Sequence, residues 1–113
     1  MEESILTSIK KLLGMTEDYT NFDTDIIIHI NSAFMVLNQL GVGPSDGFSI
    51  EDDSATWDEY IPEDDKRLEA IKTYIYLKTR LVFDPPQSGT VMDALKQSIH
   101  EYEWRLNVQA DSK

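Results

Sequence analysis

The chain has 113 residues, the size of a single domain, and it contains no cysteine. Without cysteine there are no disulfides, thiolate zinc sites or thiol nucleophiles, and two histidines are too few for a histidine-rich metal site. No apolar run approaches the roughly 20 residues of a membrane span, and the acidic start Met1-Glu2-Glu3 is unlike a signal peptide. We therefore expect one soluble, intracellular domain over residues 1–113.

The negative charge is concentrated in residues 41–65, which we call the acidic segment. The chain has 21 acidic and 10 basic residues, and the acidic segment holds nine of the acids and no base. The nine are Asp46, Glu51, Asp52, Asp53, Asp58, Glu59, Glu63, Asp64 and Asp65. Such a field repels nucleic-acid phosphates and anionic lipid, which disfavours specific DNA reading and membrane docking. The segment is either a solvated loop that maintains solubility, or a surface for a basic partner or for passing DNA.

The first predicted helix covers residues 2–13. Its apolar residues recur at helical spacing, while Lys10 and Lys11 are expected on the other side, near the C-terminal end of the helix dipole. Gly14 then supplies a left-handed stop. The apolar stripe consists of Ile5, Leu6, Ile9, Leu12 and Leu13.

The second predicted helix covers residues 26–40, with Asp23 as its N-cap. Its apolar side chains occupy more than half of the circumference, which is typical of a helix that is central to a domain or covered by another chain. Gly41-Val42-Gly43-Pro44 ends it, and no helical periodicity follows in the acidic segment. Within that segment, Phe48-Ser49-Ile50 alternates and could form a short extended piece.

The third predicted helix opens at Pro62 and ends near Phe83, before Pro85-Pro86. A fourth follows the capping residues Ser88-Gly89-Thr90, in which Thr90 with Asp93 resembles a capping box, and it frays after Asn107. The sequence thus predicts an all-α fold, a compact bundle of about four helices with a long acidic loop between the second and third. The predicted core comprises Leu6, Ile9, Leu13, Ile27, Ile30, Phe34, Leu37, Leu68, Ile71, Ile75, Leu95 and Ile99.

Residues that could carry catalysis are sparse. His29 lies among isoleucines, and His100 neighbours Glu101, but no nucleophile is spaced to work with either of them. Glu51-Asp52-Asp53-Ser54 superficially suggests calcium binding, yet it lacks the alternating ligands, turn glycine and closing glutamate of an EF-hand. No phosphate-binding or nucleophile-elbow motif occurs. We therefore expect neither an enzyme nor a bound cofactor or metal.

Aromatic and charged residues supply the candidates for a protein interface. Trp57 stands beside Asp58 in the acidic segment, so we expect it to anchor a neighbouring subunit and the segment to be mobile until assembly. Trp104 is offset by about 200° from Tyr102, which points it outward unless it folds over the core edge. The full set of interface candidates is Trp57, Asp52, Asp53, Asp58, Glu59, Tyr76, Arg80 and Trp104.

The order of several short motifs resembles the small head–tail connector proteins of long-tailed bacteriophages and prophages, the group related to the adaptor ring beneath the portal. None of the motifs is specific alone, but together they span almost the whole chain. They are Leu13-Gly14, Phe22-Asp23, Ile28-His29-Ile30-Asn31-Ser32-Ala33, Leu40-Gly41-Val42-Gly43, Thr56-Trp57, Tyr74-Ile75-Tyr76-Leu77-Lys78, Phe83-Asp84-Pro85-Pro86 and Glu101-Tyr102-Glu103-Trp104-Arg105-Leu106.

The resemblance implies an all-α structural protein that forms a homo-oligomeric ring in the virion neck. The ring would join the portal protein of the head to a tail-side stopper protein and extend the DNA channel, with DNA passing nearby without specific binding. It would assemble in the bacterial host cytoplasm, without cofactor or membrane. An acidic regulatory protein that mimics nucleic acid is the alternative, although its carboxylates would need a rigid element, and a small enzyme is the third class.

Overall fold

The structure is a computed structural model, and it describes residues 4–16, 18–62 and 64–111. Within these residues the chain is helical, which confirms the predicted all-α class, but it has five helices rather than four. They are α1 (Ile5–Leu12), α2 (Asp23–Gln39), α3 (Trp57–Tyr60), α4 (Leu68–Phe83) and α5 (Gly89–Asp111). The described residues contain one isolated β-bridge, between Ser4 and Thr56, and residues 48–50 form no β-ladder.

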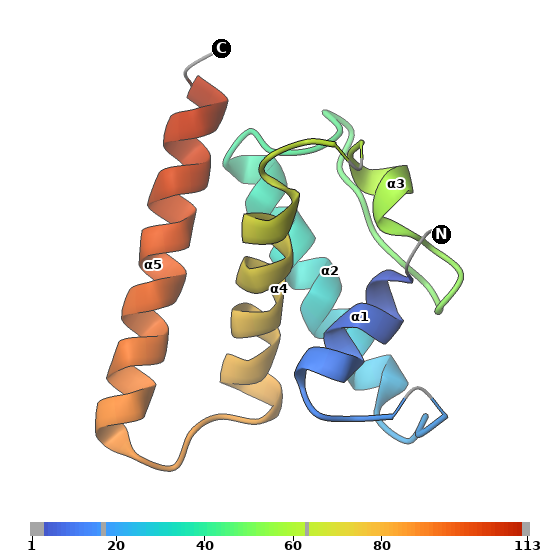
Figure 1. Cartoon of the computed structure of the whole chain (residues 1–113), viewed down its shortest axis with the longest axis vertical. Helices are drawn as coiled ribbons and strands as arrows, with labels where there is room; N and C mark the ends of the chain where they lie inside the picture. Colours follow the sequence, from blue (N-terminus) through green and yellow to red (C-terminus); the bar gives the residue numbers. More distant parts are fainter. Residues whose placement is uncertain (1–3, 17, 63, 112–113) are drawn as a thin grey trace.

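Helix α4 is the central element of the fold. It makes its largest contact with α2 and its second largest with α5, and it also touches α1. Figure 1 shows α5 along one edge of the molecule, beside α4, while α1, α3 and the acidic segment lie on the other side of α4. The acidic segment therefore occupies one flank of the bundle, and α5 the opposite one.

The C-terminus of α2 is closed by local backbone hydrogen bonds. Gly41 adopts a left-handed φ of +85°, and the next amide, of Val42, donates to the Leu37 carbonyl at 2.9 Å. Val42 then turns its side chain into the core, where it is 1% exposed. This hydrogen-bonded stop with a following apolar contact is typical of helices that end in glycine. Gly14 ends α1 with a similar φ of +87°, as predicted.

The core agrees with the predicted stripes at ten of twelve positions, while Leu13 and Ile27 are only half-buried at its edge. The acidic segment adds residues that periodicity could not assign, because it has no helical repeat. These additional buried residues are Val42, Ile50, Trp57, Tyr60 and Ile61.

Two predicted helix starts are wrong. Phe22 occupies the N-cap position of α2, and Asp23 is its first helical residue. Helix α4 begins at Leu68 rather than at Pro62, because the chain first folds a turn in which the Asp65 amide donates to the Pro62 carbonyl at 3.0 Å. Glu63, placed in that first turn by the sequence, lies outside the described residues.

Helix α5 starts as the sequence predicts but ends later. The Ser88 hydroxyl accepts a hydrogen bond from the Val91 amide at 3.4 Å, so Ser88, one of the predicted capping residues, caps the helix. Thr90, expected to form a capping box with Asp93, is already inside the helix. The helix continues to Asp111, beyond the predicted fraying point after Asn107. Residues 112 and 113 of the predicted tail lie outside the described residues.

Candidate functional site

The acidic segment is tied to the helical body at both α1 and α2. The Asn31 side chain of α2 donates to the Ile50 carbonyl at 2.9 Å and accepts from the Ile50 amide at 2.8 Å. At α1, the Ile5 amide donates to the Ala55 carbonyl at 3.0 Å. These long-range bonds hold the middle of the segment against α1 and α2 within the subunit, while its mobility before assembly stays a prediction.

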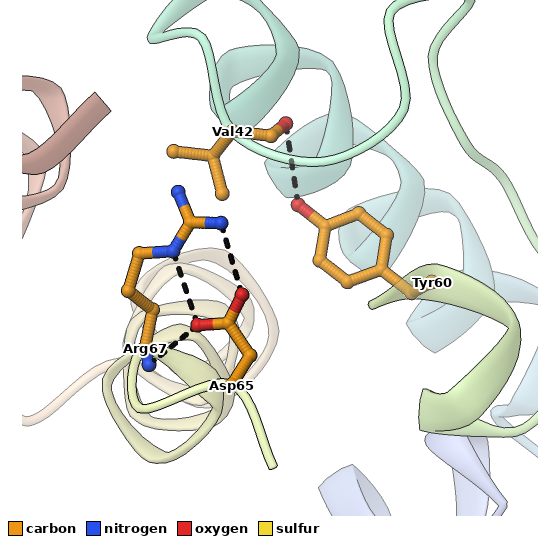
Figure 2. Close-up of polar contacts among 4 residues, drawn as sticks. All are labelled: Val42, Tyr60, Asp65 and Arg67. Atoms are coloured by element: carbon orange, nitrogen blue, oxygen red, sulfur yellow. Dashed lines mark hydrogen bonds and ion pairs between the residues drawn. The ribbon is translucent and has the colours of Figure 1, made fainter. Parts of the chain in front are cut away.

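An aromatic cluster lies beneath the segment. Phe48 and Tyr60 pack on Phe34 of α2, with ring centroids 5.0 and 4.7 Å from the Phe34 ring. The Tyr60 hydroxyl points toward the Val42 carbonyl at 3.5 Å, as Figure 2 shows, and its burial raises the pKa of Tyr60. Gly43 passes so close that a Cβ there would lie 2.6 Å from the Tyr60 ring.

The C-terminal end of the segment is closed by an ion pair. Figure 2 shows the Arg67 guanidinium facing the Asp65 carboxylate, with Nη2 3.0 Å from Oδ2 and Nε 3.2 Å from Oδ1. The hydrogen bonds that the guanidinium donates to Asp65 raise the pKa of Arg67. Asp65 is thus neutralised locally, whereas seven other acids of the segment keep exposed side chains: Asp46, Glu51, Asp52, Asp53, Asp58, Glu59 and Asp64.

Two of the interface candidates among these acids also shape the local backbone. Asp52 accepts from the Ser54 amide at 2.9 Å and from the Ser54 hydroxyl, and these bonds lower the pKa of Asp52. Glu59 accepts from the Thr56 amide at 2.8 Å in the capping box that starts α3. Asp53 and Asp58 are exposed between them. The exposed carboxylates therefore lie on a stretch of backbone that Asp52 and Glu59 help to fix through hydrogen bonds.

Trp57 differs most from its predicted role. Its side chain is 3% exposed, and its indole Nε1 donates to the Ser8 hydroxyl of α1 at 3.0 Å. The Lys72 ammonium lies 5.5 Å from the centre of its ring. The prediction of a Trp57 side chain available to a neighbouring subunit is wrong in this structure, because the ring fills the protein's own core.

The remaining interface candidates lie on α4 and α5. Tyr76 and Arg80 are half-buried on α4, and Arg80 Nη1 donates to the Tyr76 hydroxyl at 3.4 Å. The Trp104 side chain is 67% exposed, and it lies on the side of α5 opposite to the buried residues of that helix. The predicted outward orientation of Trp104 is confirmed. The structure therefore does not gather the eight candidates into one site: the acids lie in or next to α3, whereas Trp104 belongs to α5. Helices α3 and α5 lie on opposite sides of α4 (Figure 1).

The two histidines have different environments. His29 is half-buried and, with Ser32, Lys78, Leu81 and Val82, lines a hollow of about 150 Å³ between α2 and α4. His100 is exposed on α5. Across residues 4–16, 18–62 and 64–111, no three histidine, aspartate or glutamate side chains gather as a metal site would require.

Sequence reasoning missed a buried ion pair. Lys10, expected on the polar side of α1, is 2% exposed, and its ammonium lies 2.9 Å from Asp23 Oδ1 at the start of α2. The sequence held a signal for it: Lys10 follows Leu6 by four residues and precedes Leu13 by three, which places it on the core stripe. A lysine at such a position is buried only with a partner.

A second missed feature is a hollow of about 370 Å³ between α1 and α4. Two lysines on different helices border it, and no sequence spacing could have brought Lys11 and Lys72 together. The lining residues are Ser8, Lys11, Leu12, Glu69, Lys72 and Thr73. We call this site the basic hollow.

Comparison with known proteins places the chain with one family. The family model described as Phage connector protein matches residues 5–113. Neither the curated proteins nor the solved structures contain a significant match. None of the described helices combines the length and apolar character that crossing a bilayer requires.

Proposed function

The chain belongs to the phage connector protein family, and we propose that it forms the ring that joins the portal vertex of the head to the tail. The observation that carries this proposal is the family match over residues 5–113, which covers every described helix. A structural connector role in a phage particle follows from the family itself. The ring, its place in the virion neck and its assembly in the host cytoplasm are the proposed refinements.

The surface of the subunit supports association with other chains. Five large apolar side chains on four of the described helices are more than half exposed, and water-exposed apolar side chains of this size are stabilised when a partner covers them. Trp104 is the most exposed of them, at 67%; the others are Leu12, Ile28, Met35 and Val82. Helix α2 is apolar around most of its circumference because its outer face bears Ile28 and Met35 in addition to the buried residues on its inner face.

The charge of the subunit supports a place beside the DNA channel. The acidic segment carries its exposed carboxylates without any base, and a wall of that sign repels phosphates and lets DNA pass without binding. We propose that the connector contacts the portal protein on one side and the tail-side stopper on the other, with no cofactor and no catalytic step.

Particle composition tests this proposal. Heads, tails and complete particles of the parent phage are purified from infected cells, and the connector is sought in each fraction by mass spectrometry. We expect it in heads that carry the portal and in complete particles, and light scattering should show a larger complex when purified connector and portal are mixed. Recovery with a DNA-binding enzyme instead of with heads would contradict the proposal and favour a nucleic-acid mimic.

A further inference from the structure

Helix α5 is attached to the rest of the subunit mainly through one other helix. Among the helices of the described residues, α4 is the one that makes a substantial contact with α5. The buried side chains of α5 form a single stripe, which consists of Leu95, Ile99 and Leu106. Figure 1 shows that α5 lies at the edge of the molecule and runs back along α4 after the chain turns. The docked position of α5 therefore depends on the side of α4 that faces it.

Polar contacts fix the position of α5 on that surface. The hydroxyl of the buried Tyr74 donates to the Glu103 carboxylate at 2.7 Å, and the Lys78 ammonium lies 4.0 Å from the same carboxylate oxygen. Towards the C-terminal end of α5, the Asn107 side chain donates to the Leu40 carbonyl at 3.3 Å. Because these contacts join particular atoms, any copy of α5 that docks on this surface takes the same position along α4.

The linker between α4 and α5, residues 84–88, is short and mostly exposed. At its start the Asp84 amide still donates to the Arg80 carbonyl at 3.0 Å, but Asp84 itself has φ −144° and ψ 66°, outside the helical region. A residue before proline is driven out of that region, and proline inside a helix removes a hydrogen bond and clashes with the preceding turn. Pro85 and Pro86 therefore prevent α4 and α5 from joining into one helix, so that α5 can turn back onto its own α4.

The surface of α4 that holds α5 is the same whether α5 comes from its own chain or from a second copy. We propose that two copies of this chain exchange α5, each α5 docking on the α4 of the other copy, and that Pro85 and Pro86 favour the closed single subunit. The contacts of α5 described above are all kept in the exchanged form, and only the linker takes a different path. Exchange of an identical element is a low-cost route to a dimer, and short linkers promote it. This inference goes beyond the proposed ring and does not depend on it.

Variants of the linker test the role of the two prolines. Pro85→Ala with Pro86→Ala removes both helix breakers, so α4 and α5 can continue as one helix that carries the buried stripe of α5 away from its own α4. Only the α4 of a second copy then covers that stripe. The matched control, Pro44→Ala with Pro62→Ala, removes the same number of prolines outside the linker. A third variant carries a flexible Gly-Ser stretch inserted after Gln87, which lets α5 reach its own α4 freely.

Sedimentation velocity over a range of concentrations should give a different result for each protein. Wild type should show a minor dimer that grows with concentration, and the Pro44→Ala, Pro62→Ala control should behave in the same way. The dimer fraction of the Pro85→Ala, Pro86→Ala variant should exceed that of wild type by about tenfold or more, because alanine favours a continuous helix that proline forbids. The variant with the longer linker should remain monomeric. Far-UV circular dichroism shows whether each protein is helical.

Cross-linking between Lys78 and Glu103 shows which copy supplies α5. A carbodiimide joins lysine to carboxylate without a spacer, and the charged atoms of this pair are 4.0 Å apart. Isotope-labelled and unlabelled wild-type chains are unfolded, refolded together at high concentration, separated into monomer and dimer, and cross-linked. The dimer should contain Lys78–Glu103 links that join a labelled to an unlabelled chain, whereas the monomer should contain links within one chain only.

Three results would overturn the exchange of α5. They are a helical Pro85→Ala, Pro86→Ala variant that stays monomeric, a dimer in which every Lys78–Glu103 link lies within one chain, and a wild type that forms no mixed links after joint refolding. The wild-type measurement decides the question even if the alanine variant fails to fold. The proposed function is tested separately, by recovery of wild type with heads, and it stands or fails whatever the outcome for α5.

Discussion

Asn31 and Ile50, nineteen residues apart, pair through both of their hydrogen-bonding groups. The Asn31 amide nitrogen donates to the Ile50 carbonyl at 2.9 Å, and the Ile50 amide donates to Asn31 Oδ1 at 2.8 Å. A single side chain thus supplies the donor and the acceptor that a neighbouring strand would otherwise provide. The pairing fixes the acidic segment on α2 and allows Ile50 to enter the core, where it is 3% exposed.

Replacing Asn31 with alanine should destabilise the protein by about 1–3 kcal/mol, because the partly buried amide and carbonyl of Ile50 lose their partners. Urea unfolding followed by circular dichroism measures this as a lower midpoint with an unchanged slope. Ser32→Ala, at the exposed next position of α2, serves as the control and should change stability by less than about 0.5 kcal/mol. Equal effects of the two changes would show that the pairing contributes nothing to stability.

Substitutions at Gly43 and Gly47 distinguish two energetic costs of adding a side chain at a glycine, backbone strain and steric overlap with a neighbour. Both have left-handed φ values, +86° and +87°, but a Cβ at Gly43 would lie 2.6 Å from the Tyr60 ring, whereas a Cβ at Gly47 meets nothing within 4 Å. Gly47→Ala should therefore cost about 1–2 kcal/mol, the backbone strain alone. Gly43→Ala should cost clearly more in the same unfolding experiment. If both cost the same, the Tyr60 ring moves aside freely.

Two tyrosines should make the protein sensitive to alkaline pH. Burial raises the pKa of both Tyr60 and Tyr74, and for Tyr74 a hydrogen bond to Glu103 at 2.7 Å adds to the effect. Both stay protonated in the folded state at pH values where unfolded tyrosine ionises, above about 10. The unfolded state then binds fewer protons, so the stabilisation is complete below that pH and is lost as the pH rises.

Unfolding free energies measured from about pH 8 to 11 test this dependence. Wild type should lose stability steeply at the upper end, and Tyr74→Phe should lose it less steeply, because one shifted group is gone. The same variant should start from a lower value at neutral pH, since it lacks the bond to Glu103 that links α4 to α5. An unchanged alkaline slope would show that Tyr74 ionises equally in both states.

The helical bundle could be predicted from the sequence because burial on one side of a helix leaves a repeat in the sequence itself. Thus Leu6 and Ile9 in α1, or Ile71 and Ile75 in α4, are recognised from spacing alone and are buried. Helix α3 could also have been found, because Thr56 and Glu59 have the spacing of a capping box. Its four residues are too few to show a periodic pattern, which explains why it was missed.

The candidate surfaces were harder to predict, because they depend on residues far apart in the chain. Trp57 looks exposed among acids in sequence, but it is buried in the core, where its indole donates to Ser8, 49 residues away. The basic hollow forms only because α1 packs beside α4 and brings Lys11 toward Lys72. Trp104 was predictable since its exposure follows from its angular offset on a single helix.

The two tryptophans should respond in opposite ways to the same substitution. Trp57→Ala removes a buried ring and its bond to Ser8, and it should destabilise the subunit by about 3–5 kcal/mol. Trp104→Ala should change subunit stability by less than about 0.5 kcal/mol, because its ring is 67% exposed. Acrylamide quenching provides the structural check: the single tryptophan left by Trp104→Phe should be shielded, and the one left by Trp57→Phe should be accessible.

Assembly should depend on Trp104 even though folding does not. An aromatic ring exposed opposite to the buried stripe of α5 gains stability only from another chain, and tryptophan is among the residues that contribute most when an interface covers them. Incorporation of Trp104→Ala into heads should therefore fall well below wild type, while Gln97→Ala, at an exposed position on the same side of α5, should incorporate normally. Normal incorporation of Trp104→Ala would place the outer side of α5 in solvent in the finished particle, and the contacts that hold the connector would then lie on other surfaces, such as α1, α2 and α4.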